Sequence, residues 1–178
     1  MNQQLIAMND LNQLGDVFVK SHFFADSTDA AKAIVKILAG RELGFGPVAS
    51  MTGVYIVSGK PALSSNLIGA RIKGSGRYDY RVVTLDEKQC SIDFYELTPA
   101  REKIGSSTFT LDDAKRAGTK NLDRFPRNML FARALTNGAR WYCPDVFNGA
   151  VYTPDELGAH MRDQVAKEIT RDQAPEES

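Results

Sequence analysis

The chain has 178 residues, of which 43% are hydrophobic, and its 22 basic and 22 acidic side chains give a formal net charge of zero. This length predicts one compact domain with a buried core and excludes two domains of ordinary size. Because the first residues lack the pattern of a secretory signal and no apolar run approaches the roughly 18 residues that cross a bilayer, we expect a soluble, intracellular protein without a membrane partner.

The first predicted element is an amphipathic helix over about residues 9–24. Its apolar side chains recur at helical spacing, and Asn9 or Asp10 is placed to cap it. A second helix follows, which Ser27 or Thr28 can cap and which ends near residue 44. Its expected apolar stripe is formed by Ala31, Ile34, Val35, Leu38 and Ala39.

The periodicity then changes from helical to alternating. Residues 53–57 and 61–63 predict a short hairpin around the turn SGK. A third helix, capped by Ser64 or Ser65, runs into the basic, glycine-broken stretch RIKGSGR. The cations of that stretch are therefore expected at a helix C-terminus or just beyond it.

A second hairpin is predicted in the middle of the chain. Residues 78–85 and 90–97 alternate between apolar and polar side chains around the polar turn DEKQ, and residues 106–109 are expected as a further strand. These segments predict a small antiparallel sheet.

Three helices are predicted after the strands. Thr110 caps a short one that ends at Gly118, and its acidic first turn and basic last turn complement the helix dipole. The next covers about residues 127–141 with Pro126 at its start, and the last covers about residues 153–170. Together the elements predict an α+β fold, in which a small antiparallel sheet with a hairpin packs against several helices.

The helix over residues 127–141 carries the first candidate site. Arg133, Asn137 and Arg140 stand at positions i, i+4 and i+7 and therefore share one face. No carboxylate stands beside these arginines in the helix, so the face is a candidate anion-binding stripe. The alternative is that the arginines pair with carboxylates elsewhere in the fold.

Charge is unevenly distributed along the chain. Residues 60–140 carry 15 basic and 9 acidic side chains, a net charge of +6, whereas residues 141–178 carry a net charge of −5. In the basic region, cations are interleaved with aromatic residues. This pairing can hold single-stranded nucleic acid through phosphates and stacked bases, although each aromatic also suits the core.

Other candidate sites have less support. The G-x-G-x-x-A pattern at residues 44–49 follows a helix rather than a strand, so nucleotide binding is not expected. The two histidines lack metal-ligand spacing, and Asp112 with Asp113 as a Mg²⁺ site competes with their role at a helix start. Cys90 and Cys143 lack a C-x-x-C spacing and are expected to be buried, reduced thiols.

Three blocks stand out along the chain: GRELGFGPVASMTGVYIVSGKPALSSNLIGARIKGSGRYDYRVV, then FTLDDAKRAG, then FPRNMLFARALTNGARWYCPDVFNGAVYTPDEL. In this order they resemble the RecT and Redβ superfamily of phage single-strand annealing proteins, most closely its RecT side. The resemblance covers roughly residues 30–157. Its specificity lies in the three blocks and their order.

The resemblance implies an ATP-independent protein that binds single-stranded DNA, assembles into rings or helical filaments and promotes pairing of complementary strands through an annealed duplex intermediate. It implies no catalytic residue and no cofactor, with Mg²⁺ as a candidate modulator of DNA binding, and a phage or prophage protein in the cytoplasm of a bacterial host. The resemblance also implies which motif residues bind DNA: Arg71, Lys73, Lys115, Arg116, Arg127, Arg133, Asn137 and Arg140. The cationic run before the third block adds Lys120 and Arg124.

Three regions are expected on this basis. Residues 1–26 form an N-terminal amphipathic helix and a candidate oligomer contact, residues 27–171 the RecT-like annealing domain, and residues 172–178 an acidic, disordered tail. The chain is short at both ends compared with many relatives, so a separate module for binding an exonuclease or single-strand-binding protein is expected to be reduced or missing. The acidic tail is a candidate substitute for it.

Two other functions stay open at this point. One is a Mg²⁺-dependent phage nuclease or nucleotide-processing enzyme built on Asp112 and Asp113. The other is a structural interaction module whose basic face meets an acidic protein.

Overall fold

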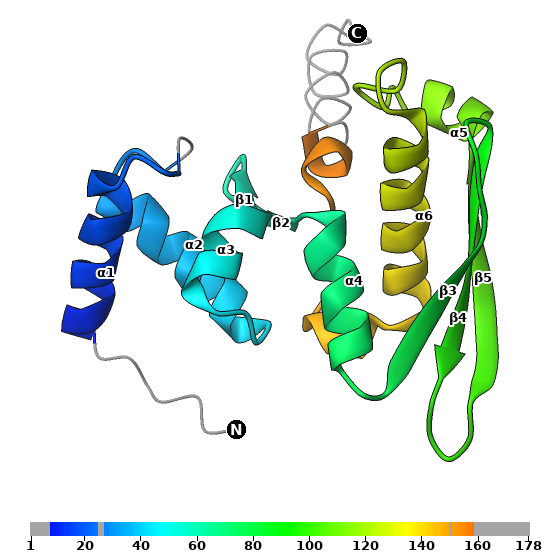
Figure 1. Ribbon diagram of the computed structural model, residues 1–178, viewed down its shortest axis with the longest axis horizontal. Helices are drawn as coiled ribbons and strands as arrows, with labels where there is room; N and C mark the ends of the chain where they lie inside the picture. The colour runs from blue at the N-terminus through cyan, green and yellow to red at the C-terminus, as the bar shows by residue number, and fades with distance from the viewer. Residues whose placement is uncertain (1–7, 25–26, 150, 159–178) are drawn as a thin grey trace, which may run out of the picture. The chain divides into compact units, whose positions relative to one another are not determined.

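The computed structural model describes residues 8–24, 27–149 and 151–158 (Figure 1). The fold is α+β, with small antiparallel sheets and several helices, as the sequence predicts. The chain divides into two compact units, residues 1–56 and residues 57–178.

The first unit contains the three helices α1 (Met8–Lys20), α2 (Ala30–Glu42) and α3 (Pro47–Gly53). Leu11, Ala33, Ile37 and Met51 form its buried apolar cluster. Each helix contributes to this cluster, so burial of apolar surface holds the three together.

α1 ends earlier than its apolar pattern predicts. The Ser21 hydroxyl donates a hydrogen bond to the Phe18 carbonyl (2.7 Å), and His22 takes the left-handed conformation with φ 55°. These interactions end the helix before the predicted limit near residue 24. The prediction that Asn9 or Asp10 caps the helix is wrong, because both lie within it.

α2 begins at a different cap from the one predicted. Asp29, rather than Ser27 or Thr28, is the N-cap, and its carboxylate accepts the backbone N–H of Lys32 at 2.8 Å. The same hydrogen bond lowers the pKa of the Asp29 carboxyl below its ordinary value. Several neighbouring polar residues could serve as a cap, and the sequence alone does not rank them.

The buried face of α2 also differs from the predicted stripe. Ala33, Ile37 and Gly40 are buried, whereas Val35 is 50% exposed. The physical reason is the close approach of α3. A Cβ added to Gly40 would stand 2.0 Å from the Ser50 hydroxyl oxygen, so the contact requires glycine.

α3 is absent from the predicted elements. Its seven residues are too few to show a helical period, and the Gly-Pro pair before them resembles a loop. Pro47 instead occupies the first turn, where a missing N–H costs nothing. Lys36 of α2, only 3% exposed, donates from Nζ to the Met51 carbonyl of α3 at 2.8 Å.

The short hairpin is present as predicted. β1 (Val54–Val57) pairs with β2 (Lys60–Leu63) in a two-stranded sheet. Ser58 and Gly59 make the turn with φ values of 50° and 78°, which suit a two-residue hairpin loop. The boundary between the two units falls within this hairpin.

The second unit continues with α4 (Ser65–Gly74) and the strands β3 (Tyr78–Leu85), β4 (Gln89–Glu96) and β5 (Glu102–Thr110). The strands form an antiparallel sheet in the order β3-β4-β5, which confirms the predicted hairpin and further strand. β5 is longer than predicted because residues before 106 continue its pairing with β4.

The long helix α6 (Pro126–Tyr142) packs on the sheet, and α4 lies beside it (Figure 1). Ile92 and Phe94 of β4 are fully buried. The helix approaches closely because Gly138 lies against Phe94. A Cβ added to Gly138 would stand 2.0 Å from the Phe94 ring. The buried core of this unit also includes Ile68, Ile72, Leu130, Ala134, Leu135 and Ala139.

Two further predictions concern the buried thiols and the last helix. Cys90 and Cys143 are free and buried as predicted, and burial raises the pKa of their thiols to about 11 and about 12. Residues 154–158 are helical, whereas the rest of the predicted last helix and the acidic tail lie outside the described residues. Within the described part of the chain, no helix combines the length and apolar content that a membrane crossing requires.

Thr110 caps α5 (Leu111–Arg116) as predicted, and the structure adds that Asp113 completes a capping box with it. The Thr110 hydroxyl oxygen accepts the Asp113 N–H at 3.1 Å, and the Asp113 carboxylate accepts the Thr110 N–H at 3.0 Å. The pKa of the Asp113 carboxyl lies below its ordinary value, chiefly because the Thr110 hydroxyl and backbone N–H donate hydrogen bonds to it. A hydrogen bond from Arg116 lowers this pKa further.

Thr110→Ala should therefore lower the free energy of unfolding by about 1 kcal/mol at neutral pH. The pKa of Asp113 is lower in the folded protein than in the unfolded chain. Its contribution to the free energy of unfolding is therefore fully present above the pKa of the unfolded chain and is lost as the pH falls through the pKa of the folded protein. Urea unfolding of both proteins at pH 7 and at about pH 2 should show the difference shrinking at acid pH. A difference that stays the same at both pH values contradicts this role of the carboxylate.

Candidate nucleic-acid interface

The predicted stripe on α6 is occupied by an internal carboxylate. Arg140 donates from Nη2 to Glu156 Oε1 at 2.9 Å and also to the Asn137 side chain, and from Nη1 to the Val151 carbonyl at 2.9 Å. Arg133 Nη1 lies 3.5 Å from the same Glu156 oxygen. The three stripe residues do share one face, but the expectation of a free anion-binding surface is not met in this structure.

The network is largely removed from solvent. The side chains of Arg133 and Arg140 are 15% and 21% exposed, and that of Glu156 is 5% exposed. The Arg133 guanidinium lies over the Phe109 ring and that of Arg140 over the Tyr152 ring, with centroid distances of 5.1 and 5.0 Å. Within the described residues, Arg133 Nε has no hydrogen-bond partner. These arginines therefore match the alternative of an ion pair with a distant carboxylate.

Sequence reasoning missed Glu156. It forms a capping box with Thr153, whose N–H and hydroxyl each donate to Glu156 Oε2 at 3.1 Å. The other carboxylate oxygen faces α6, where it pairs with Arg133 and Arg140. The spacing of Thr153 and Glu156 indicates the capping box, but no signal in the sequence indicates this second contact.

The two candidate residues on α4 also have partners in the fold. Arg71 Nε donates to the Val146 carbonyl at 2.9 Å. Lys73 forms an ion pair with Asp79, and its Nζ lies 4.6 Å from the centroid of the Tyr80 ring. Both side chains therefore support the packing of α4 in the second unit.

The charges of α5 are divided between two roles. Arg116 lies in the last turn as predicted, and it also pairs with Asp113 on the same helix. Asp113 is thus occupied by the capping box and by Arg116, and among the described residues no three His, Cys, Asp or Glu side chains gather as a metal site. Lys115 is exposed and has no ion pair within the described part of the chain.

Three more cations follow, two in the connection from α5 to α6 and one in the first turn of α6. Lys120, Arg124 and Arg127 are exposed, and none forms an ion pair with a described residue. Arg127 lies near the β3–β4 turn, since its charge adds to the backbone N–H groups of Lys88 and Gln89 that lower the pKa of Asp86.

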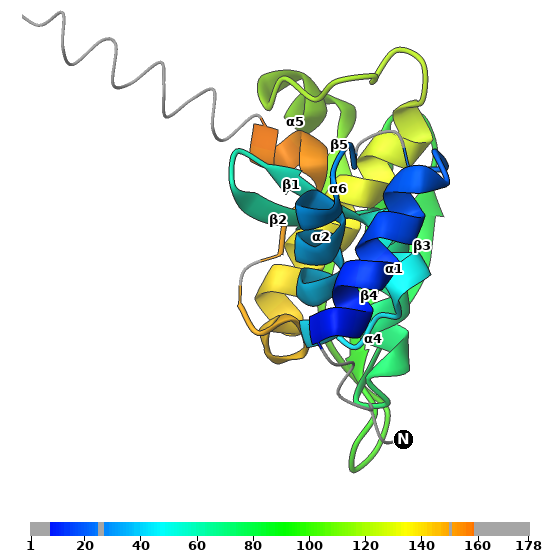
Figure 2. The same cartoon turned by 90° about the vertical axis from the view of Figure 1, so that its left-hand side faces the viewer.

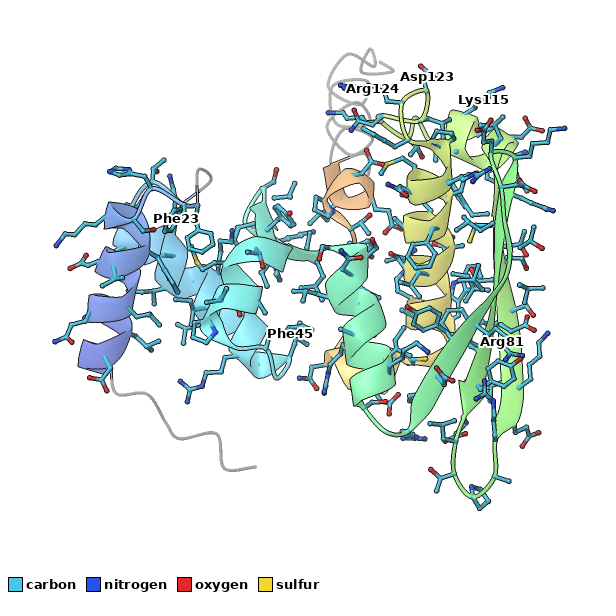
Figure 3. The ribbon with its side chains drawn as sticks, viewed as in Figure 1. Phe23, Phe45, Arg81, Lys115, Asp123 and Arg124 are labelled. Carbon is cyan, nitrogen blue, oxygen red and sulfur yellow. The ribbon has the colours of Figure 1, made fainter. Side chains whose placement is uncertain are left out.

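Lys115, Lys120, Arg124 and Arg127 are here called the α5–α6 cationic cluster. Figures 1 and 2 show α5, the connection and the start of α6 at one end of the second unit, and Figure 3 shows Lys115 and Arg124 there. Asp123 is exposed at the same end, so the cluster is not purely cationic.

The connection that carries the cluster has a defined backbone. Gly118 and Asn121 take φ values of 60° and 56°. The Lys120 N–H donates to Asp155 Oδ1 at 3.2 Å, and the Phe125 N–H donates to the Asn121 carbonyl at 3.0 Å. These contacts fix the backbone while leaving the long cationic side chains in solvent.

The start of α6 differs from those of α2, α4 and α5. Phe125 stands at the N-cap, and no side chain accepts a hydrogen bond from the first turn, whereas Asp29, Ser64 and Thr110 accept such bonds in the other three helices. As in α2 and α4, no acidic residue lies in the first turn. The Phe125 ring is 49% exposed, and the Arg124 guanidinium lies 5.5 Å from its centroid. The positive end of the helix dipole thus adds to the cluster.

No protein-family model, curated protein or solved structure was found to match this chain.

Proposed function

We propose that the chain is an ATP-independent single-strand annealing protein of the RecT type. The proposal is that it binds single-stranded DNA through the phosphate backbone, assembles on it as rings or helical filaments and promotes pairing of complementary strands in phage recombination. Support comes from the three sequence blocks, which span both units, and from the order of hairpin, helix, antiparallel sheet and long helix. Its place of action would be the cytoplasm of a bacterial host.

The observation that carries the proposal is the α5–α6 cationic cluster. Its four side chains are exposed and without ion pairs in the described residues. They belong to α5, the connection and the first turn of α6, which lie at one end of the second unit (Figure 1). They fall within or between the second and third sequence blocks. Exposed cations bind phosphates without reading the base sequence, which is what an annealing protein requires.

The proposed interface is smaller than the ten residues expected from the sequence. Arg133, Asn137 and Arg140 form the internal network with Glu156, and Arg71 is bonded to a carbonyl. Binding by one protomer would then neutralise only a few phosphates, so its affinity would be modest and would fall as the salt concentration rises. Assembly of several protomers along one strand would supply the remaining affinity.

Annealing makes and breaks no covalent bond. The protein would hold each strand by its phosphates and leave the base edges free to test a second strand. Neutralising phosphate charge also lowers the repulsion between the two strands that must meet. An exonuclease or a single-strand-binding protein is the expected partner class in this process.

The decisive experiment mixes two complementary fluorescent oligonucleotides with the protein and no nucleotide. Faster duplex formation without cleavage is the expected result. Mg²⁺-dependent shortening of the strands would favour the nuclease alternative. A mobility-shift assay at low salt that shows no complex would favour the protein-interaction module and overturn the proposal.

Arg124→Gln should reduce the salt dependence of single-stranded DNA binding. Losing one phosphate contact lowers the slope of log K against log salt by about 0.7. Arg81→Gln is the matched control, because Arg81 is exposed on β3 and has no ion pair within the described residues (Figure 3). Fluorescence anisotropy at several salt concentrations measures both slopes. If the slope of log K against log salt is the same for the two variants, Arg124 does not contact a phosphate and is not part of the interface.

A further inference from the structure

Few aromatic side chains of the described residues are open to solvent. Phe94, Phe109 and Tyr78 are buried, at 0%, 7% and 5% exposure. Tyr95 is partly buried and has the Arg101 guanidinium 4.3 Å from its centroid. The three buried rings fill the core, so a base could not stack on them without rearrangement of the fold. The Arg101 guanidinium beside Tyr95 is held there by an ion pair with Asp79.

The exposed aromatic side chains are Phe23, Phe125 and Trp141, at 86%, 49% and 58% exposure. Phe23 belongs to the first unit, whereas the candidate cations belong to the second. Trp141 packs edge-on against Tyr142, with ring centroids 6.2 Å apart, near the opposite end of α6 from the cluster. Phe125 alone among these three stands within the α5–α6 cationic cluster.

The backbone holds Phe125 in place. Its N–H donates to the Asn121 carbonyl at 3.0 Å, and its carbonyl accepts the Met129 N–H at 3.1 Å as part of the first turn of α6. Pro126 restricts the backbone on its C-terminal side. The backbone of Phe125 therefore loses little conformational entropy when its ring meets a ligand.

We propose that Phe125 stacks on an unpaired base of single-stranded DNA while Arg124 and Arg127 hold the flanking phosphates. The inference rests on the proposed function and assigns one side chain a contact with bases rather than with phosphates. Stacking on one aromatic face accepts every base, so it positions the strand without selecting a sequence. Watson–Crick edges stay free because stacking uses only the face of the base.

Phe125→Ala should weaken binding of a single-stranded oligonucleotide about fivefold to tenfold, the lower part of the range for one stacked base, because the ring is half-buried. The slope against salt should not change, since no phosphate contact is lost. Phe125→Tyr should bind like the wild type. Trp141→Ala is the matched control for loss of an exposed aromatic side chain on the same helix and should change affinity less than twofold.

An oligonucleotide with abasic sites separates stacking from an indirect effect on the connection. Phe125→Ala and the wild type should bind this oligonucleotide equally. If the variant binds both oligonucleotides with wild-type affinity, or is weakened equally on both, Phe125 does not stack and the inference is wrong. If the wild type forms no complex with single-stranded DNA at low salt, both the proposed function and this inference are wrong.

A fluorescent version tests the contact without truncating the ring. The chain has one tryptophan, so Trp141→Phe combined with Phe125→Trp places the only indole at position 125. Single-stranded DNA should quench its fluorescence, and the abasic oligonucleotide should not. Equal quenching by both oligonucleotides would contradict base stacking.

Discussion

Glu156→Gln should lower the free energy of unfolding by about 3 kcal/mol. The substitution keeps the size and most hydrogen-bonding capacity of the side chain but removes the negative charge that Arg133 and Arg140 share. All three side chains are more than three-quarters buried, so the two guanidinium groups would stay in a poorly solvated place without a counter-ion. Urea unfolding followed by circular dichroism measures the change.

Glu96→Gln is the matched control for this loss of charge. Glu96 pairs with Arg77 at 3.0 Å, but the two side chains are 33% and 54% exposed. An exposed pair contributes less than about 1 kcal/mol, so the control should stay close to the wild type. Equal stability of Glu156→Gln and wild type, together with tighter binding of single-stranded DNA, would restore the α6 stripe as an anion-binding surface.

Gly138→Ala should destabilise the second unit by about 2 kcal/mol. The added Cβ would stand 2.0 Å from Phe94 Cε2 and 2.2 Å from Cζ, and the Phe94 ring is fully buried against β4 and α6. Overpacking of a core costs roughly 1–3 kcal/mol, and the better helix propensity of alanine offsets only about 1 kcal/mol. The helix and sheet must move apart to admit the methyl group.

Gly74→Ala tests the same substitution in open space. Gly74 is also helical, at the end of α4, and a Cβ there meets no atom within 4 Å. This variant should be as stable as the wild type or gain a few tenths of a kcal/mol. Thermal unfolding of both glycine variants compares them directly, and a similar loss at the two positions would show that packing against Phe94 is not the cause.

The elements that the sequence predicts correctly are those with local causes. The capping box of Thr110 and Asp113 uses residues of one turn, and Pro126 marks the start of α6 by its own geometry. The alternation of β4 likewise follows from burial of one of its faces, whereas most of β3 is exposed or only partly buried. The periodicity of apolar residues and the local start signals of helices are therefore sufficient to predict the α+β class and the order of most elements.

Some errors are local, such as the caps of α1 and α2 and the missed α3, but those that affect the candidate site concern contacts between residues distant in sequence. The orientation of α2 depends on Gly40 meeting Ser50, and the state of Arg140 depends on Glu156, which follows it by 16 residues. Neither pairing leaves a periodic signal in the sequence. The location of the cations without ion pairs was therefore only partly predictable. Lys120 and Arg124 are exposed to solvent, whereas Arg133 and Arg140 of the α6 stripe are mostly buried.

Asp155 and Glu156 are neighbours in sequence, yet they attach to different parts of the second unit. Asp155 holds the backbone of Lys120, and Glu156 holds two arginines of α6. A modification or partner that displaces Asp155 and Glu156 would therefore have two effects at once. The connection from α5 to α6 would become more mobile, and the guanidinium groups of α6 would lose their counter-ion, so the positive potential of the surface would rise.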